Sequence, residues 1–186
     1  LGTRIYFKND YKLDRNKSHI IVANHQSMYD IPPLIWYLRR LHPKFISKKE
    51  LGKGIPSISY NLKHGGSVLI DREDRGNALK GIEKFGQQIQ FKKQSAVIFP
   101  EGTRSRNGKL KRFSENGFRA LVESCSDAVI VPVSIKNSWK LQKYGMFPLP
   151  LGVKISFKVH EPIEANVHSF NQIFKHCLCK ISEEVE

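Results

Sequence analysis

A histidine and an aspartate follow a short apolar run near the beginning of this chain. The run is Ile20 to Ala23, and the polar stretch Asn24 to Asp30 comes directly after it, with His25 and Asp30 as its ionisable members. Histidine can accept and release a proton near neutral pH. A carboxylate beside it can fix its tautomer and stabilise its charged form. The pair therefore predicts general-base chemistry that needs neither a serine nor a cysteine nucleophile.

The spacing of His25 and Asp30 is also compatible with a purely structural role. Five residues on a regular helix lie about 140° apart, so the two side chains would meet best if His25 sits in the turn and Asp30 at the start of a helix. An H-x4-D pattern taken alone more often gives a helix-capping aspartate and an ordinary loop histidine. Whether similar polar turns follow other apolar runs in the chain helps to distinguish these two interpretations.

Two more polar turns follow apolar runs. The run 67–70 ends in Asp71 and Arg72, and the run 96–99 leads into a turn with a carboxylate, a glycine, a hydroxyl and a guanidinium, which are Glu101, Gly102, Thr103 and Arg104. The guanidinium fork matches phosphate oxygens, and glycine lets the backbone approach a ligand closely. The cationic run 106–112 comes next, and it is either a solvated loop or an anion funnel.

The elements that must position these turns alternate between strand and helix patterns. Strands are expected at 4–7, 18–23, 44–47, 67–70, 96–99, 129–135 and 154–160, and helices at 34–41, 55–62, 77–93, 117–124 and 169–186. Continuous apolar runs are typical of parallel strands, whose carboxyl ends share one edge of a sheet. We therefore expect a single α/β domain over residues 1–186, with a mixed, mostly parallel sheet flanked by helices on both faces. Pro132 argues for a bulge or an edge position in its strand.

The composition favours a partner that carries phosphate or other negative charge. Lys and Arg number 31 among 186 residues against 17 Asp and Glu, which gives a formal charge of +14. Such a surface suits nucleic acid, anionic lipid, a phosphorylated substrate or an acidic carrier protein. The sequence has no nucleic-acid-binding signature, no Gly-x-Ser-x-Gly elbow of a hydrolase and no Cys-x-x-Cys pair for a metal. Its apolar runs are shorter than the roughly 18 to 20 residues that cross a bilayer.

Four stretches, in this order, resemble the motifs of the glycerolipid acyltransferases. Asn24 to Asp30 looks like their N-H-x4-D motif, and Gly66 to Arg72 is similar to their second motif. Phe99 to Ser105 and Val131 to Val133 match the third and the fourth, and 48–51 resembles a lysine-containing stretch of the family. Each motif is weak alone. Four in order, each at a strand end or within a strand, favour the catalytic interpretation of His25 and Asp30.

The resemblance implies transfer of a fatty acyl group from an acyl thioester to the free sn-2 hydroxyl of lysophosphatidic acid, giving phosphatidic acid for phospholipid synthesis. His25 would be the general base and Asp30 would orient it. Lys48 or Lys49, with backbone N–H groups near the first turn, would stabilise the oxyanion. The acceptor would be held by Arg72, Glu101, Gly102, Thr103 and Arg104. Among these, Glu101 is expected to position an arginine or the glycerol backbone.

The resemblance also implies partners and a location. Acyl-CoA or acyl carrier protein would supply the acyl group, and neither a cofactor nor a metal would be needed. An anionic membrane surface is the expected partner, at the cytoplasmic face of a membrane. The chain would bind there peripherally or through a missing N-terminal segment, because family members commonly begin with apolar helices and this chain shows none. Two alternatives stay open: another acceptor such as glycerol 3-phosphate, or a basic nucleic-acid-binding module.

Overall fold

The computed structural model describes residues 2–49, 65–71, 74–145 and 147–185. Within these residues, eight strands form one sheet in the order β1-β7-β6-β2-β5-β3-β4, and β8 also pairs with β6. The strands are β1 (Arg4–Lys8), β2 (His19–Ala23), β3 (Pro43–Lys48), β4 (Val68–Ile70), β5 (Ser95–Ile98), β6 (Val129–Lys136), β7 (Lys154–Val159) and β8 (Ile163–Glu164). The helices are η1 (Met28–Asp30), α1 (Ile31–Tyr37), η2 (Arg39–Leu41), α3 (Arg75–Lys92), α4 (Glu115–Ser124), η4 (Ser138–Gln142) and α5 (Phe170–Val185).

The sheet is mixed and mostly parallel, as the sequence predicts. Strand β2 lies between β5 and β6 and runs parallel to both, and β3 continues the parallel set beyond β5. Strands β7 and β8 pair antiparallel with β6, and β1 pairs parallel with β7 at the far edge, so these three strands run opposite to the others that the structure describes. The carboxyl ends of β2 and β5 are therefore neighbours, and so are the turns that follow them.

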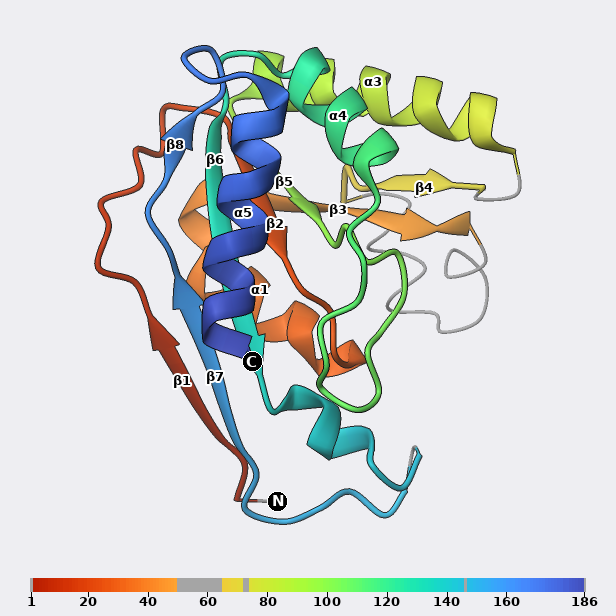
Figure 1. Cartoon of the computed structure of the whole chain (residues 1–186), viewed down its shortest axis with the longest axis vertical. Helices are drawn as coiled ribbons and strands as arrows, with labels where there is room; N and C mark the ends of the chain where they lie inside the picture. The colour runs from red at the N-terminus through yellow and green to blue at the C-terminus, as the bar shows by residue number, and fades with distance from the viewer. Residues whose placement is uncertain (1, 50–64, 72–73, 146, 186) are drawn as a thin grey trace.

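Helices cover both faces of the sheet, and β2 divides its side chains between the two layers (Figure 1). Ile20 and Val22 pack in the core beneath α3, α4 and α5, whereas Ile21 and Ala23 pack in the core formed with α1, η2 and η4. All five residues of β2 are buried. Alternate side chains of a strand point to opposite faces, so a strand covered on both faces is apolar on both, as Ile20 to Ala23 are. This burial anchors the end of β2, where the polar turn begins.

The edge position expected for Pro132 is wrong, whereas the expected bulge is supported. Ile130 pairs with Ile163 and Val133 pairs with Val159, so two residues of β6 face three residues of the opposite segment at Pro132. Strand β6 is an interior strand with β2 on one side. On its other side β8 pairs with Val129 and Ile130, and β7 pairs with residues from Val133 onward. Pro132 lies between these two partners, and its carbonyl accepts from the N–H of His160 at 2.9 Å. Its nitrogen points to the same side as that carbonyl, so the missing N–H removes no bond to β2.

The helix after the first polar turn begins earlier than the sequence pattern indicates. It starts at Ile31 and ends at Tyr37, and η2 follows at Arg39–Leu41. Pro32 and Pro33 lie in its first turn, where the missing N–H groups have no partner in the helix to lose. The expected helix at 55–62 lies outside the described residues. Among the helices that the structure describes, none has the length and apolar character needed to cross a membrane.

Candidate active site

The histidine of the first turn is held by the aspartate. His25 Nδ1 lies 2.8 Å from Asp30 Oδ2, with His25 in the turn after β2 and Asp30 at the end of η1. The carboxylate is fully buried, whereas 16% of the His25 side chain is exposed. A carboxylate only accepts hydrogen bonds, so Nδ1 carries the proton and the lone pair is on Nε2. The arrangement leaves His25 able to act as a base on a group that approaches Nε2.

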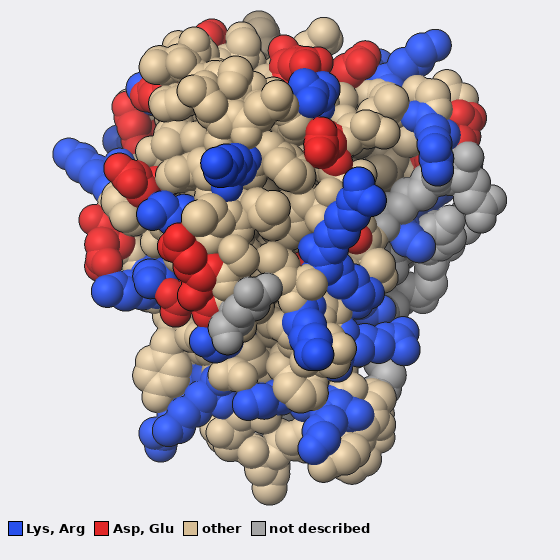
Figure 2. All heavy atoms as spheres, viewed as in Figure 1, with Lys and Arg blue, Asp and Glu red and all other residues tan. Residues whose placement is uncertain are grey.

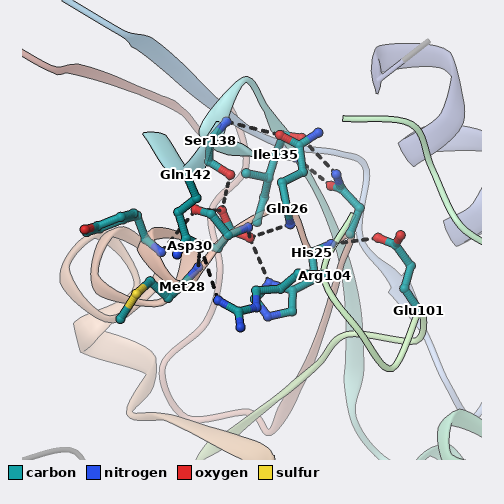
Figure 3. A network of polar contacts seen from close by, with 12 residues as sticks. His25, Gln26, Met28, Asp30, Glu101, Arg104, Ile135, Ser138 and Gln142 are labelled. Carbon is teal, nitrogen blue, oxygen red and sulfur yellow. Dashed lines mark hydrogen bonds and ion pairs between the residues drawn. The ribbon is translucent and has the colours of Figure 1, made fainter. Parts of the chain in front are cut away.

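Asp30 also caps the turn that it closes. Its Oδ2 accepts from the backbone N–H groups of Gln26 at 2.7 Å and Ser27 at 2.9 Å. Its Oδ1 accepts from the hydroxyl of Ser138 (Figure 3). Hydrogen bonds to the ionised form stabilise a buried carboxylate against loss of solvent. The capping and the histidine-orienting interpretations of the H-x4-D pattern are therefore both correct, because one carboxylate does both.

Further residues of this network come from β6 and η4, and the sequence pattern did not single them out. The side-chain amide of Asn24 bonds both the carbonyl and the N–H of Ile135, at 2.8 and 2.7 Å. Ser138 reaches Asp30, and Gln142 Oε1 accepts from Met28 N at 3.1 Å. Asn24 is the first residue of the polar motif, so the sequence does indicate that this position has a role in the site. Ser138 and Gln142 lie between the expected strands 129–135 and 154–160, in a segment without a chemical pattern of its own.

Glu101 joins the second turn to the first. Its Oε1 accepts from His25 N at 2.7 Å and its Oε2 from Lys111 N at 2.9 Å. Figure 3 shows it across the His25 backbone from Asp30. Burial raises the pKa of Glu101 to about 7, against the opposing effect of the two N–H donors. The structure thus gives Glu101 a positioning contact with the backbone of His25, and its expected contact with an arginine or the glycerol stays a prediction.

The remaining residues of the second turn place the cation of Arg104 beside the first turn. Arg104 Nη1 donates to Gln142 Oε1 at 3.3 Å, and the same oxygen accepts from Met28 N. Gly102 takes a φ of +68°, which glycine adopts without strain, and its N–H donates to Phe99 O at 2.9 Å. Thr103 is exposed. The structure therefore brings Arg104 to the turn that carries His25.

An aromatic ring supports the histidine from the side. The ring of Phe99 stacks on the imidazole of His25, with 4.2 Å between the ring centroids. Phe45 of β3 follows, with its ring centroid 6.4 Å from that of Phe99. Such stacking restricts rotation of the imidazole about its Cβ–Cγ bond, because the flat faces of both rings are in contact.

The two lysines predicted for the oxyanion lie at the end of β3 and directly after it. Lys48 ends β3, which is separated from β2 by β5. The next residue, Lys49, places its Nζ 3.9 Å from Asp71 Oδ2, at the end of β4. Among the described residues, no hydrogen bond or ion pair joins either lysine to His25, so their oxyanion role stays a prediction. Arg72 lies outside the described residues.

Backbone donors near the first turn are already engaged. The N–H groups from His25 to Tyr29 donate in sequence to Glu101, Asp30, Asp30, Gln142 and the hydroxyl of Ser27. An oxyanion could bind one of them only by competing with a charged or neutral acceptor of the protein. The expectation that these N–H groups stabilise the oxyanion therefore has no support in this arrangement.

The fold and the site together define an α/β protein whose His–Asp pair can take a proton from a hydroxyl group, next to an arginine suited to an anion. The sequence profile of the Acyltransferase family matches residues 4–136, which is most of the chain. The chain belongs to the Acyltransferase family.

Individual relatives agree with this assignment. A 1-acyl-sn-glycerol-3-phosphate acyltransferase of Helicobacter pylori is 35% identical over 125 residues, which are 66% of this chain and 50% of that protein. The protein of that name from Saccharomyces cerevisiae is 31% identical over 70% of this chain and 43% of its own length. The chain thus spans half or less of these relatives. The crystal structure of PlsC, the 1-acyl-sn-glycerophosphate (LPA) acyltransferase of Thermotoga maritima, superposes with a TM-score of 0.81 at 26% identity, covering 98% of this chain and 71% of that one.

Proposed function

We propose that this chain transfers a fatty acyl group from an acyl thioester to the sn-2 hydroxyl of lysophosphatidic acid, giving phosphatidic acid. The observation that carries the proposal is the bond of 2.8 Å between His25 Nδ1 and the buried Asp30, beside a turn that presents Arg104. The names of the relatives support the choice of acceptor, because each acts on an acylglycerol phosphate.

The proposed reaction is a direct attack by the acceptor. His25 Nε2 takes the proton of the acceptor hydroxyl while the hydroxyl oxygen bonds to the carbonyl carbon of the thioester. Asp30 stabilises the imidazolium that forms, because it already accepts the Nδ1 proton. The tetrahedral intermediate then collapses, the carbon–sulfur bond breaks, and the proton on Nε2 passes to the departing thiolate. General-base catalysis of this kind contributes typically about 10²- to 10⁴-fold in rate.

The acceptor phosphate is assigned to Arg104. Its guanidinium is partly buried and donates to a neutral amide oxygen, so a phosphate can replace that partner with a charged one. Thr103 offers an exposed hydroxyl next to it. Gly102 lets the turn approach the phosphate closely, although its own N–H closes the turn. The substrate role of Arg72 and the oxyanion role of Lys48 and Lys49 stay predictions.

The donor and the location form part of the same proposal. Acyl-CoA or acyl carrier protein supplies the thioester as co-substrate, and no cofactor or metal takes part. The chain acts at the cytoplasmic face of a membrane on an anionic lipid surface, which suits its formal charge of +14. Both its acceptor and its product are lipids that carry a phosphate.

The test is an assay of the purified chain with lysophosphatidic acid, glycerol 3-phosphate and a lysophospholipid without a free phosphate, each with acyl-CoA and with acyl carrier protein as donor. We expect acylation of lysophosphatidic acid, and loss of turnover by at least about 10²-fold in His25→Ala with acceptor binding retained. If the enzyme prefers glycerol 3-phosphate, then glycerol 3-phosphate is the acceptor and the assignment of lysophosphatidic acid is wrong. Unchanged turnover in His25→Ala would refute the assignment of the base.

A further inference from the structure

We infer that the segment after η4 is the surface by which this chain docks on an anionic bilayer. Three large apolar side chains on this segment are mostly exposed: Tyr144 at 61%, Phe147 at 78% and Leu151 at 77%. Large apolar side chains in water normally find a core or a partner, so a group of them in one loop marks an interaction site. We name Tyr144, Phe147 and Leu151 the apolar tip.

Cations flank the apolar tip. Lys140 and Lys143 precede it, and Lys154 begins β7 directly after it. Arg4 of β1 is paired with Lys154 across the sheet, so two exposed cations lie side by side there. Lys143 Nζ lies 5.4 Å from the ring centroid of Tyr144, which keeps a positive charge against the apolar tip. We call these four cations the basic collar.

The charge around the tip is of one sign. The sequence from Lys136 to His160 contains five lysines and neither Asp nor Glu. Within the described part of the chain, none of the four collar residues forms an ion pair with a carboxylate. Figure 2 shows the result, since the lower end of the face in view carries blue and tan atoms without red ones. An apolar tip inside a basic collar matches a bilayer whose headgroups are anionic, because the tip enters the interface while the collar binds phosphate.

The same segment is continuous with the candidate active site. Gln142, which bonds the N–H of Met28 and the guanidinium of Arg104, is two residues before Tyr144. Figure 1 places η4 and the loop after it at the lower end of the molecule, below the turn that follows β2. A bilayer that contacts the apolar tip would therefore lie at the edge of the sheet where His25 is found. This inference rests on the proposed function, in which the acceptor and product are membrane lipids.

The test measures binding of the chain to vesicles in the absence of substrate. Vesicles of phosphatidylcholine alone are compared with vesicles containing phosphatidylglycerol, by co-sedimentation at low and high salt. We expect binding to the anionic vesicles that weakens in high salt, since exposed charges are screened. Absence of binding, or equal binding to both kinds of vesicle, would overturn the inference.

Matched variants locate the surface. The tip variant, with Tyr144, Phe147 and Leu151 each changed to Ser, should bind anionic vesicles at least about 10-fold more weakly. The control changes Phe91 and Val167 to Ser, because they are 87% and 73% exposed but lie at the end of α3 and just before α5, at the opposite edge of the sheet. The inference fails if the tip variant binds like the wild type, or loses no more than this control.

A second pair of variants tests the collar. Changing Lys140, Lys143 and Lys154 to Gln should weaken binding on the order of 100-fold, since each lysine near an anionic surface adds several-fold. Changing the exposed Lys84, Lys92 and Lys93 of α3 and its C-cap to Gln removes the same charge from elsewhere and should have a small effect. Equal losses would mean that only net charge matters, which would refute a defined surface.

Two further readouts separate this inference from the proposed function. Turnover of a short-chain, monomeric lysophosphatidic acid without vesicles should be unchanged in the tip variant, since none of the three substituted residues forms a hydrogen bond, ion pair or ring contact with His25 or Arg104. If neither the wild type nor the tip variant shows turnover, that result counts against the proposed function. Vesicle binding then remains the test of the surface. If the collar variant retains vesicle binding and loses activity with acyl carrier protein only, the surface binds the acidic carrier and the bilayer assignment is wrong.

Discussion

The turns after β2 and after β5 are neighbours at one edge of the sheet, yet their ionisable groups are held in different ways. In the first, the Asp30 carboxylate is fully buried and accepts from His25, from two backbone N–H groups and from Ser138. In the second, Arg104 is only partly buried, and its side chain has a single hydrogen bond to the part of the chain that the structure describes, of 3.3 Å to a neutral amide. A group that moves a proton is held in place, whereas a group that binds a charged substrate is left able to change partners.

This comparison predicts that the two turns control different kinetic constants. Rigid positioning of a base acts on the chemical step and so on kcat, because the benefit appears only when the proton moves. A cation that binds the acceptor in the ground state and in the transition state acts mainly on KM. Substitutions in the two turns should separate accordingly.

The largest effect is expected from Asp30→Asn. The amide cannot accept all of the bonds that the carboxylate accepts, and it no longer holds the proton on Nδ1. We expect kcat to fall by about 10²- to 10⁴-fold with the acceptor KM nearly unchanged. Steady-state kinetics at saturating donor would measure both constants.

Ser134→Ala is a matched control for Asp30→Asn. It removes a buried hydrogen bond between Ser134 and His160, and within the described residues neither side chain bonds to His25 or Asp30. It should lower stability and leave kcat within about a factor of two. A similar fall of kcat in both variants would mean that Asp30 acts through general stability.

Arg104→Ala should act mainly on acceptor binding. Loss of a charge-assisted hydrogen bond to phosphate costs about 1.5 to 3 kcal/mol, which corresponds to a KM higher by roughly 10- to 150-fold. The measurement compares KM for lysophosphatidic acid with KM for the acyl donor. A rise in donor KM alone would show that Arg104 binds the donor, and a loss confined to kcat would break the comparison between the two turns.

Glu101→Gln tests a residue that lies in the turn after β5 but bonds the backbone of His25 in the turn after β2. A glutamine can accept from only one of the two backbone N–H groups that Glu101 now binds, His25 N and Lys111 N. We expect kcat to fall by about 10-fold, since one buried donor then lacks its partner. A change confined to acceptor KM would instead support the substrate role predicted for Glu101.

Glu101 also gives a pH dependence of stability that the same variant should remove. Its pKa is raised from 4.5 to about 7 in the folded protein, so the folded state binds more protons than the unfolded state between these two values. The free energy of unfolding should then fall as the pH rises through this window, by roughly 3 kcal/mol at most. Denaturation at pH 5 and pH 8 would measure the slope, and an identical slope in Glu101→Gln would contradict the assignment.

The smallest effect is expected from Gln142→Ala. Its amide oxygen accepts from Met28 N and Arg104 Nη1, so it joins the rigid turn to the adaptable one. Loss of the neutral bond from Met28 N costs about 0.5 to 1.5 kcal/mol, and we expect kcat/KM to fall by roughly 3- to 10-fold. Gln142→Glu is the informative companion, because a carboxylate would hold Arg104 more tightly and should raise the acceptor KM. No change in either variant would show that the two turns act independently.

Local patterns in the sequence were sufficient for the fold class and for the two reactive turns. The apolar runs at 18–23 and 96–99 read as parallel strands because both faces of such strands are buried, and the structure places β2 and β5 there. His25 and Asp30 could be paired because they are close in sequence, so chain geometry alone limits their separation. The proline correctly indicated an irregularity in its strand, but not that the strand is interior, because the partners of β6 are set by residues far away in the chain.

Only the tertiary structure decided which groups complete the site. Ser138 bonds Asp30 across 108 positions and Glu101 bonds His25 across 76. Gln142 joins Met28 across 114 positions. No local preference encodes such contacts, because they arise when β6 and β5 pair with β2 and bring their following turns to one edge. The sequence alone determined which residues could move a proton or bind an anion, and the packing of the sheet determined which of them meet.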